Sequence, residues 1–428
     1  QGRVRTMETI GDDMYATAVA FTDENDNTVI MINTDLLRSY QNYNPTTQAR
    51  IAEAVGIPAE QVIITCNHSH SVPDLNYSDP ATERYRTQVY DRITDAAIKA
   101  MEDRKPATLA TGSIEAEGLN FVRHYWAENI YTGERVMLTD NFGDATNTKY
   151  VGHAAEADPT LHMIRIAREG EKDILFTNWR AHPHRSGGRE KVTLDADVIG
   201  ATRAYMHAKT DYLFAYYQGA AGNMNTTSRL SGETYKSGKI TEYGNELGRQ
   251  LINGMNKLQP AETGLIETAK ILYDAEVDHT QDDKYEQAVA LKEYYYANPT
   301  EMNVYENQIK KAAEYGFTSV FHATRLITKY GLGPTKQMEL NIFSIGDSFA
   351  FYTAPAELWD SFGEETEALS PFPMTFTIGY CNGGVAYIPY KLDYFVSYEY
   401  FYCLFKQDDV INQMQDYYLE HLHKQFGN

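Results

Sequence analysis

The chain has 428 residues, with 38 lysines and arginines against 59 aspartates and glutamates, so its formal net charge is −21. Binding to nucleic acid or to anionic lipid needs an excess of cationic side chains, so this composition disfavours both partners. Hydrophobic residues make up 43% of the chain, which is enough for a large core and excludes a disordered protein.

The first 260 residues alternate between apolar strand patterns and amphipathic helical patterns. Strands are predicted at residues 28–33, 61–66, 161–166, 174–179 and 213–217. Helices are predicted at residues 48–55, 83–103, 195–208 and 243–255. This order predicts an α/β fold in which a mostly buried sheet lies between helices.

Residues 282–315 interrupt the alternation, because they are polar and predict two helices broken at Asn298-Pro299. We interpret residues 281–316 as a helical insertion. Strand patterns return at residues 338–345, 349–352 and 374–380. Since neither repeats nor a flexible linker is evident, we expect residues 1–428 to form one large α/β domain, with layers of mixed, mostly buried sheet flanked by helices.

The aromatic and cysteine contents add two expectations. The 33 tyrosines outnumber the 17 phenylalanines and 3 tryptophans together, and tyrosine suits polar binding surfaces as well as the edges of a core. Cys66, Cys381 and Cys403 are too few for a disulfide framework, although one pair remains open. No run of 18 apolar residues predicts a membrane span.

Two copies of a His-x-His pattern follow predicted strands: His68 and His70 after one, His182 and His184 after the other. In an extended segment, residues two apart point to the same side, so each copy offers two imidazoles to one space. A single copy is equally well explained as a pair of surface residues. Two copies at strand ends, where α/β proteins usually bind ligands, favour a metal site.

Glu357 and the segment 218–225 are further candidates. Glu357 follows a predicted strand and Pro355, and it is either a metal ligand or an ordinary glutamate in the first turn of a helix. The glycines and alanines of residues 218–225 allow the backbone to approach a ligand closely. No phosphate-binding loop or dinucleotide fingerprint is present, which argues against nucleotide chemistry.

Taken in order, these motifs resemble the catalytic domain of neutral ceramidases. The resemblance is carried by residues 68–73, 178–184, 218–225, 354–357 and 386–388, and it extends over essentially the whole chain. Neutral ceramidases are zinc amidases that are secreted or face the outside of the cell. The resemblance therefore implies a secreted, periplasmic or cell-surface protein, from which a signal peptide has been removed because the chain opens at Gln1.

The resemblance also implies roles for individual residues. His68, His182, Glu357 and Tyr387 would bind one zinc ion, and all four match in type. His70 would support a ligand or move a proton, and Tyr398 would bind the developing oxyanion.

Two departures bear on the substrate. Asn225 replaces the family's serine, so a serine acyl-enzyme is excluded at this position. The chain ends at Asn428, without room for the immunoglobulin-like C-terminal domain of full ceramidases. Both departures move the expected substrate from a lipid towards a polar, glycan-derived molecule.

Three functions fit these residues. The first is zinc-dependent hydrolysis of an amide or ester, with His70 moving the proton and Asn225 donating to the oxyanion. The second is β-elimination from a uronic-acid glycoside, a lyase reaction, in which the metal, Asn225 and Arg185 would neutralise the carboxylate. His70, His184 and Tyr387 or Tyr398 would then serve as base and acid. The third is an inactive sugar- or metal-binding homologue.

Overall fold

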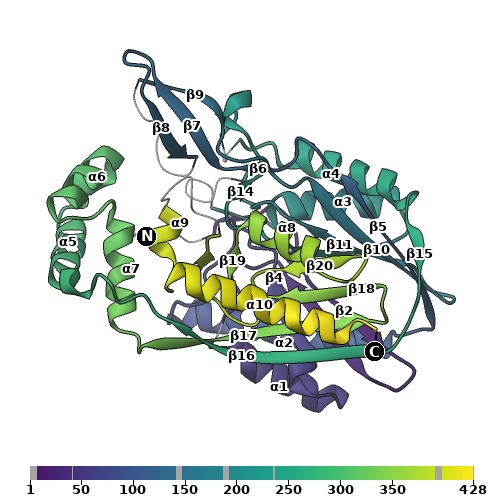
Figure 1. Cartoon of the computed structure of the whole chain (residues 1–428). Helices are drawn as coiled ribbons and strands as arrows, with labels where there is room; N and C mark the ends of the chain where they lie inside the picture. The colour runs from purple at the N-terminus through teal and green to yellow at the C-terminus, as the bar shows by residue number, and fades with distance from the viewer. Residues whose placement is uncertain are drawn as a thin grey trace.

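The computed structural model of the chain describes residues 7–40, 42–140, 147–186, 192–234, 237–390 and 398–427. Three β-sheets with helices on their outer faces make up most of these ranges (Figure 1). The predicted α/β fold, with mixed sheet layers flanked by helices, is confirmed.

The first sheet has the order β2-β3-β4, formed by Ala16–Thr22, Thr28–Thr34 and Val62–Cys66. Strand β3 is antiparallel to β2 and parallel to β4. Helices α1 (Asn44–Val55) and α2 (Pro80–Glu102) pack on one face. The carboxylate of Asp79 accepts hydrogen bonds from the N–H groups of Ala81 and Thr82, so α2 begins three residues earlier than its apolar pattern predicts.

The second sheet has five strands in the order β13-β11-β10-β5-β15. They are Leu213–Gln218, Ile174–Trp179, Thr160–Arg168, Ala107–Glu115 and Gln259–Ala261. Only β11 and β13 form a parallel pair, and the other neighbours are antiparallel. Helices α3 (Asp197–Lys209) and α4 (Ile240–Met255) cover the outer face, which matches the two helices predicted there.

The third sheet has the order β16-β17-β18-β20, formed by Ile266–Glu276, Thr335–Ile345, Phe349–Thr353 and Thr375–Ile378. Again one pair is parallel, β18 with β20. Helices α8 (Asp360–Leu369) and α10 (Gln407–Gln425) pack on its outer face, and α10 crosses the front of the molecule in yellow (Figure 1).

The inner faces of the three sheets share one apolar core. Alternate residues of a strand point to opposite faces, so Val29 and Met31 of β3 enter this core while the residues between them face the helices. Phe351 of β18 lies between the other two sheets: its ring centroid is 6.5 Å from that of Phe21 and 5.4 Å from that of Phe176. The positions of the sheets therefore depend on one another.

Buried tyrosines join these layers. The hydroxyl of Tyr217 in the second sheet donates to the carbonyl oxygen of Met31 in the first, at 2.9 Å. The hydroxyl of Tyr418 in α10 donates to the carbonyl oxygen of Thr353 in β18, at 2.7 Å. Several of the surplus tyrosines thus act inside the fold, where the ring fills the core and the hydroxyl satisfies a carbonyl.

Shorter elements complete the chain. Paired two-residue strands are β1 (Thr9–Ile10) with β12 (Thr193–Leu194), β6 (Phe121–Val122) with β14 (Met224–Asn225), and β19 (Glu357–Leu358) with β21 (Tyr387–Ile388). A projecting sheet at the top of Figure 1 comprises β7 (His124–Asn129), β8 (Arg135–Thr139) and β9 (Thr148–His153). Short 3-10 helices lie at Ala59–Gln61, Arg229–Ser231, Asp282–Lys284 and Glu301–Asn303, and α9 spans Tyr398–Tyr402.

A helical group stands at the left of Figure 1, after β16. Helices α5 (Tyr285–Ala297) and α6 (Tyr305–Glu314) lie on either side of Asn298-Pro299, where the sequence predicts the break. A third helix, α7 (Val320–Tyr330), packs with them around its own small apolar cluster, which includes Leu291 and Phe317. This third helix lies beyond the predicted insertion.

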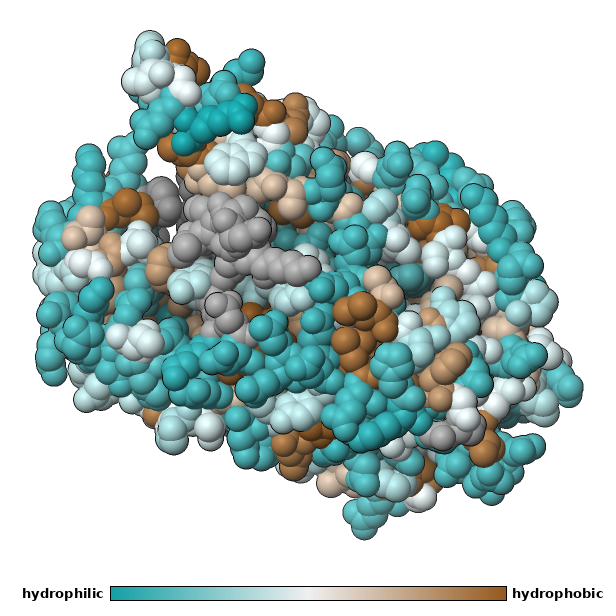
Figure 2. Space-filling view, in the orientation of Figure 1, coloured by the Kyte–Doolittle hydropathy of each residue, from teal (hydrophilic) through white to brown (hydrophobic). Residues whose placement is uncertain are grey.

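Three further features concern the described ranges. Cys66, Cys381 and Cys403 are buried free thiols. None of the helices described is both long and apolar enough to cross a bilayer. The face shown in Figure 2 is largely hydrophilic, with hydrophobic side chains in small separate patches.

A buried ion-pair network joins the second sheet to α8. Arg180, whose side chain is 1% exposed, contacts Asp158 at 2.8 Å and Glu367 at 2.7 Å. Burial raises the pKa of Glu367, but the guanidinium of Arg180 together with His162 and Thr377 outweighs burial and lowers this pKa to about 2. Both carboxylates thus depend on one cation.

Replacing Arg180 with methionine (Arg180→Met) should lower the free energy of unfolding by about 3–5 kcal/mol, because it removes the cation that Asp158 and Glu367 share in a buried setting. The matched control is Arg165→Met, which removes a pair with Asp173 in which the arginine is 45% exposed. That variant should lose less than about 1 kcal/mol. Denaturant unfolding measures both, and equal losses would contradict the prediction.

Candidate functional site

The candidate site lies where the parallel strand pairs of the three sheets end. The chain leaves β4 towards His68, β11 towards His182 and β18 towards Glu357. Buried hydrogen bonds hold these ends together. Thr65 Oγ1 donates to the Gly379 carbonyl at 2.8 Å, and Asn178 Nδ2 donates to the Thr377 carbonyl at 3.0 Å. Side chains far apart in sequence therefore meet at one edge.

Two histidines and one glutamate point their polar atoms at a common space. His68 Nε2 lies 3.4 Å and His182 Nε2 lies 3.3 Å from Oε2 of Glu357. All three atoms are buried, and none has a hydrogen-bond partner among the residues that the structure describes. Such atoms cost free energy unless something satisfies them.

The tautomer of His68 explains why these atoms need a cation. Its Nδ1 lies 2.6 Å from the carbonyl oxygen of Leu37, which can only accept, so Nδ1 carries the hydrogen and Nε2 carries a lone pair. Burial also lowers the pKa values of His68 and His182, which keeps both imidazoles neutral. The lone pair of His68 Nε2 therefore faces the Glu357 carboxylate, an arrangement that repels unless a positive ion lies between them.

The residues present fit a zinc ion. Nitrogen and oxygen ligands about 2.0–2.1 Å from a tetrahedral zinc ion lie about 3.3–3.4 Å from one another, which is the separation found here. Ring nitrogens of His68, His70 and His182 also lie within 4.8 Å of one another, which makes His70 an alternative third ligand.

His70 and His184 complete a cluster of four imidazoles. The centroid of the His70 ring is 4.7 Å from that of His68 and 5.6 Å from that of His184. The backbone N–H of His70 donates to the carbonyl of Pro183 at 3.3 Å, which links the two His-x-His motifs directly. Loss of hydration, then the other three imidazoles, holds the pKa of His70 well below its usual value, although His70 is the exposed member.

Tyr387 reaches the site through strand register. Strands β19 and β21 are parallel, with Glu357 directly opposite Tyr387. Residues opposite each other point to the same face, so the two side chains are neighbours. The short strand also corrects the expected strand-to-helix junction at Glu357, because α8 begins only at Asp360.

The glycine-rich segment supports Glu357 through the backbone. The N–H of Gly222 donates to the Leu358 carbonyl at 2.6 Å. A Cβ atom at Gly222 would lie 2.5 Å from the carbonyl oxygen of Glu357. The sequence predicts a close approach to a ligand at this segment, whereas the approach seen at Gly222 is to the strand that carries Glu357.

Asn225 is fully buried behind the histidines. Its backbone pairs with that of His182, and its Nδ2 donates to Asp140 at 2.9 Å. Its side chain also contacts His184, and this contact opposes the strong lowering of the His184 pKa by burial.

Arg123 is a buried cation beside the cluster. Its guanidinium lies over the ring of Tyr387 at 5.6 Å, and it is among the causes that lower the pKa values of His182 and His184, after burial. Glu399 in α9 binds Arg123 at 2.8 Å and His124 at 3.2 Å, and all three side chains are fully buried. Glu399 is not predictable from local pattern as the partner of Arg123 and His124, because it lies about 275 positions later in the chain.

Two further predicted catalytic residues are Arg185 and Tyr398. The guanidinium of Arg185 is buried and donates to the hydroxyl groups of Thr226 and Ser237, each at 3.0 Å, and it lies over the ring of Tyr243. These contacts anchor the second His-x-His motif. Tyr398 is the first residue of α9, and its side chain lies outside the described part of the structure.

Several residues at the site have a left-handed backbone. His68, Tyr380 and Ala386 have φ values of +66°, +59° and +68°. Residues other than glycine rarely adopt this backbone conformation, which costs about 1–3 kcal/mol at functional sites. At His68 the Tyr380 ring stacks on the imidazole with centroids 4.4 Å apart, and this contact helps to hold the ring in place.

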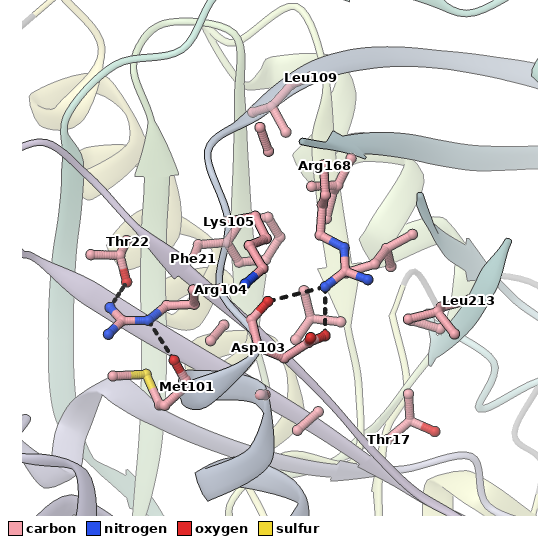
Figure 3. Close-up of a pocket in the computed structure, with 18 of the residues that line it drawn as sticks. Thr17, Phe21, Thr22, Met101, Asp103, Arg104, Lys105, Leu109, Arg168 and Leu213 are labelled. Carbon is pink, nitrogen blue, oxygen red and sulfur yellow. Dashed lines mark hydrogen bonds and ion pairs between the residues drawn. The ribbon is translucent and has the colours of Figure 1, made fainter. Parts of the chain in front are cut away.

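A cavity of about 920 Å³ lies away from the histidine cluster (Figure 3). It includes Ile174 and Leu213, the first residues of β11 and β13, so it lies at the opposite ends of these strands from the histidines. Arg168 there is paired with Asp103 at 2.5 Å, and Arg104 donates to Thr22 at 2.6 Å. We therefore place the chemistry at the histidines rather than in this cavity.

Comparison with solved structures supports this fold. The chain is similar to the neutral ceramidase from Pseudomonas aeruginosa, with a TM-score of 0.67 and 14% identity over 98% of this chain and 70% of that one. It is also similar to a ceramidase complexed with C2, with a TM-score of 0.63 and 14% identity over 94% and 68%. No protein-family model matches the chain, and neither does any curated protein. The resemblance to ceramidases is thus supported at the level of the fold.

The contact of Gly222 gives a direct test of how Glu357 is held. Gly222→Ala should lower the free energy of unfolding by about 1–3 kcal/mol or more, because the new methyl group overlaps the Glu357 backbone. Gly152→Ala is the control, since a Cβ atom there meets nothing within 4 Å. Thermal unfolding of both variants checks the prediction, and an unchanged Gly222→Ala melting temperature would refute it.

Proposed function

We propose that this protein is a zinc-dependent hydrolase that cleaves an amide or ester bond in a polar substrate. The observation that carries the proposal is the set of unpartnered atoms of His68, His182 and Glu357 around one space. The similarity of the fold to ceramidases supports the same reaction class.

His68, His182, Glu357 and Tyr387 would hold the ion. A zinc ion supplies Lewis-acid polarisation of a carbonyl group and lowers the pKa of water. The neutral imidazoles, the carboxylate and the buried setting suit such an ion, and Glu357 reduces its net charge.

His70 would move the proton during hydrolysis. It is exposed and adjoins His68 and His184, and a neutral imidazole has one ring nitrogen with a lone pair that can accept a proton. It would take the proton from the attacking water and deliver it to the leaving group. His184 lies beside it and would orient its ring.

The residue at the family's serine position favours direct attack by water. Asn225 cannot form an acyl-enzyme, and its Nδ2 already donates to Asp140. We propose that Asn225 donates its second amide hydrogen to the oxyanion or orients His184. Arg123 adds positive charge beside Tyr387, and Tyr398 stays a candidate oxyanion donor on α9.

The elimination reaction gains no support from the comparisons. Of the three groups expected to neutralise a uronate, the metal, Asn225 and Arg185, the guanidinium of Arg185 is engaged by Thr226 and Ser237. Hydrolysis is therefore the reaction we propose. A glycan-derived substrate and an extracellular location stay predictions from the sequence.

Metal content tests the ligand set first. Protein purified without chelator should contain about one zinc ion per chain, and His182→Ala should bind zinc far more weakly because it loses one of the two imidazole ligands proposed for the ion. His279→Ala is the matched control, since that histidine pairs with Asp282 away from the cluster. Elemental analysis measures all three proteins. Full zinc occupancy in His182→Ala would show that the ion is held elsewhere.

His70→Ala separates proton transfer from metal binding. We expect this variant to keep its zinc while kcat on an activated ester such as para-nitrophenyl acetate falls by about 10²–10⁴-fold, the usual contribution of a general base. Activity and zinc content are measured on the same sample. If zinc is lost instead, His70 is a ligand, as its distance to His68 and His182 also allows.

A further inference from the structure

A cavity of about 250 Å³ opens beside the proposed metal ligands. His68, Glu357 and Tyr380 line one side of it, and Arg38 and Arg325 line another. Arg38 follows the first sheet, whereas Arg325 comes from α7 in the helical group, so two distant parts of the chain bring their cations to one cavity.

Within the described ranges, both guanidinium groups lack a carboxylate partner. Among the described residues, neither Arg38 nor Arg325 forms an ion pair, and the Nε atom of each is buried without a hydrogen-bond acceptor. Other buried arginines of this protein are paired: Arg180 has two carboxylates and Arg123 has Glu399. The cavity is therefore an exception to how the fold treats buried arginine.

The surroundings of the two groups place them close together. Arg325 lies over the ring of Tyr402, 3.7 Å from its centroid, and the same tyrosine is among the groups that raise the pKa of Arg38. Burial, and after it the charge of Arg38 among other causes, lowers the pKa of Arg325. Glu357 and Asp74 attract Arg38 through space, but they do not contact it as an ion pair.

Two cations in one partly buried cavity are costly unless an anion compensates them. Guanidinium groups match carboxylate and sulfate oxygens in charge and in hydrogen-bond geometry. Tyr402 also links the cavity to Tyr387, with ring centroids 6.0 Å apart, so a group bound by the arginines would lie next to the proposed reaction centre.

We propose that Arg38 and Arg325 bind an oxyanion group of the substrate, a carboxylate or a sulfate, and so select anionic amides or esters. That the bound molecule is a substrate rests on the proposed function. The existence of the binding site depends only on the two arginines. It also gives the helical group a role, because α7 supplies one of the two cations.

The test compares three ligands of one shape: para-acetamidobenzoate, para-acetamidobenzenesulfonate and the uncharged para-acetamidobenzamide. Calorimetric titration measures their affinities for zinc-loaded protein and for chelator-treated protein. At least one of the two anions should bind at least about 10-fold more tightly than the uncharged amide, both to zinc-loaded and to chelator-treated protein. The anion that binds more tightly shows whether the site prefers a carboxylate or a sulfate. Equal affinities for all three ligands would overturn the proposal.

Variants show whether the arginines cause the preference. Arg38→Met and Arg325→Met should each remove most of it, whereas Arg92→Met, on the exposed surface of α2, should retain it. Arg38→Lys and Arg325→Lys keep the charge and should recover part of it, which guards against loss by misfolding. A preference that survives both methionine variants would overturn the proposal.

The two proposals fail separately. Anion preference in a protein that never binds zinc would leave the arginine site intact and remove the hydrolase. Zinc binding without anion preference would leave the proposed hydrolase intact and remove the arginine site. Zinc content is therefore measured on every sample used for titration.

Discussion

The shared apolar core is the constraint on which the site depends. Three sheets bury one face each against the same phenylalanines, so none of them can shift without opening a cavity in the common core. The parallel pair in each sheet ends at the same side of this core. This shared core can hold His68 Nε2 and His182 Nε2, which follow two of the sheets, 3.3–3.4 Å from Oε2 of Glu357, which follows the third.

That precision serves an electrostatically unfavourable arrangement. The site gathers neutral imidazoles, a carboxylate and several residues with positive φ, each of which costs folding free energy in isolation. The surrounding contacts offset this cost: Leu37 fixes the tautomer of His68, and Gly222 allows close packing on Glu357. A bound cation would remove the remaining penalty, so metal binding should stabilise the fold as well as supply chemistry.

Charge is distributed unevenly over this protein. The whole chain carries −21, but the side chains near the histidines include the buried cation Arg123, and the adjoining cavity includes Arg38 and Arg325. Net charge governs long-range encounters, whereas a few buried groups govern what binds. An acidic protein can therefore hold a locally positive site.

The fold class follows largely from the sequence because it depends on local periodicity. Apolar runs at residues 28–33 and 174–179, and the break at Asn298-Pro299, predict their elements closely. The predicted starts of α2 and α8 are less accurate, because capping by Asp79 and the pairing of β19 with β21 depend on contacts that periodicity does not show.

For the site, the sequence by itself determined the residue types and their places at strand ends for the two His-x-His motifs and Glu357, whereas Tyr387 was implied only by the resemblance to ceramidases. Tertiary structure alone decided which of these groups face one another and which cations serve them. Arg185 looks suited to the pocket from its position beside His184, yet its guanidinium anchors a loop, while Arg38 and Arg325 reach the cavity from elements 287 positions apart by their residue numbers. The physical reason is that side-chain direction and ion pairing depend on packing between distant segments, which no local pattern encodes.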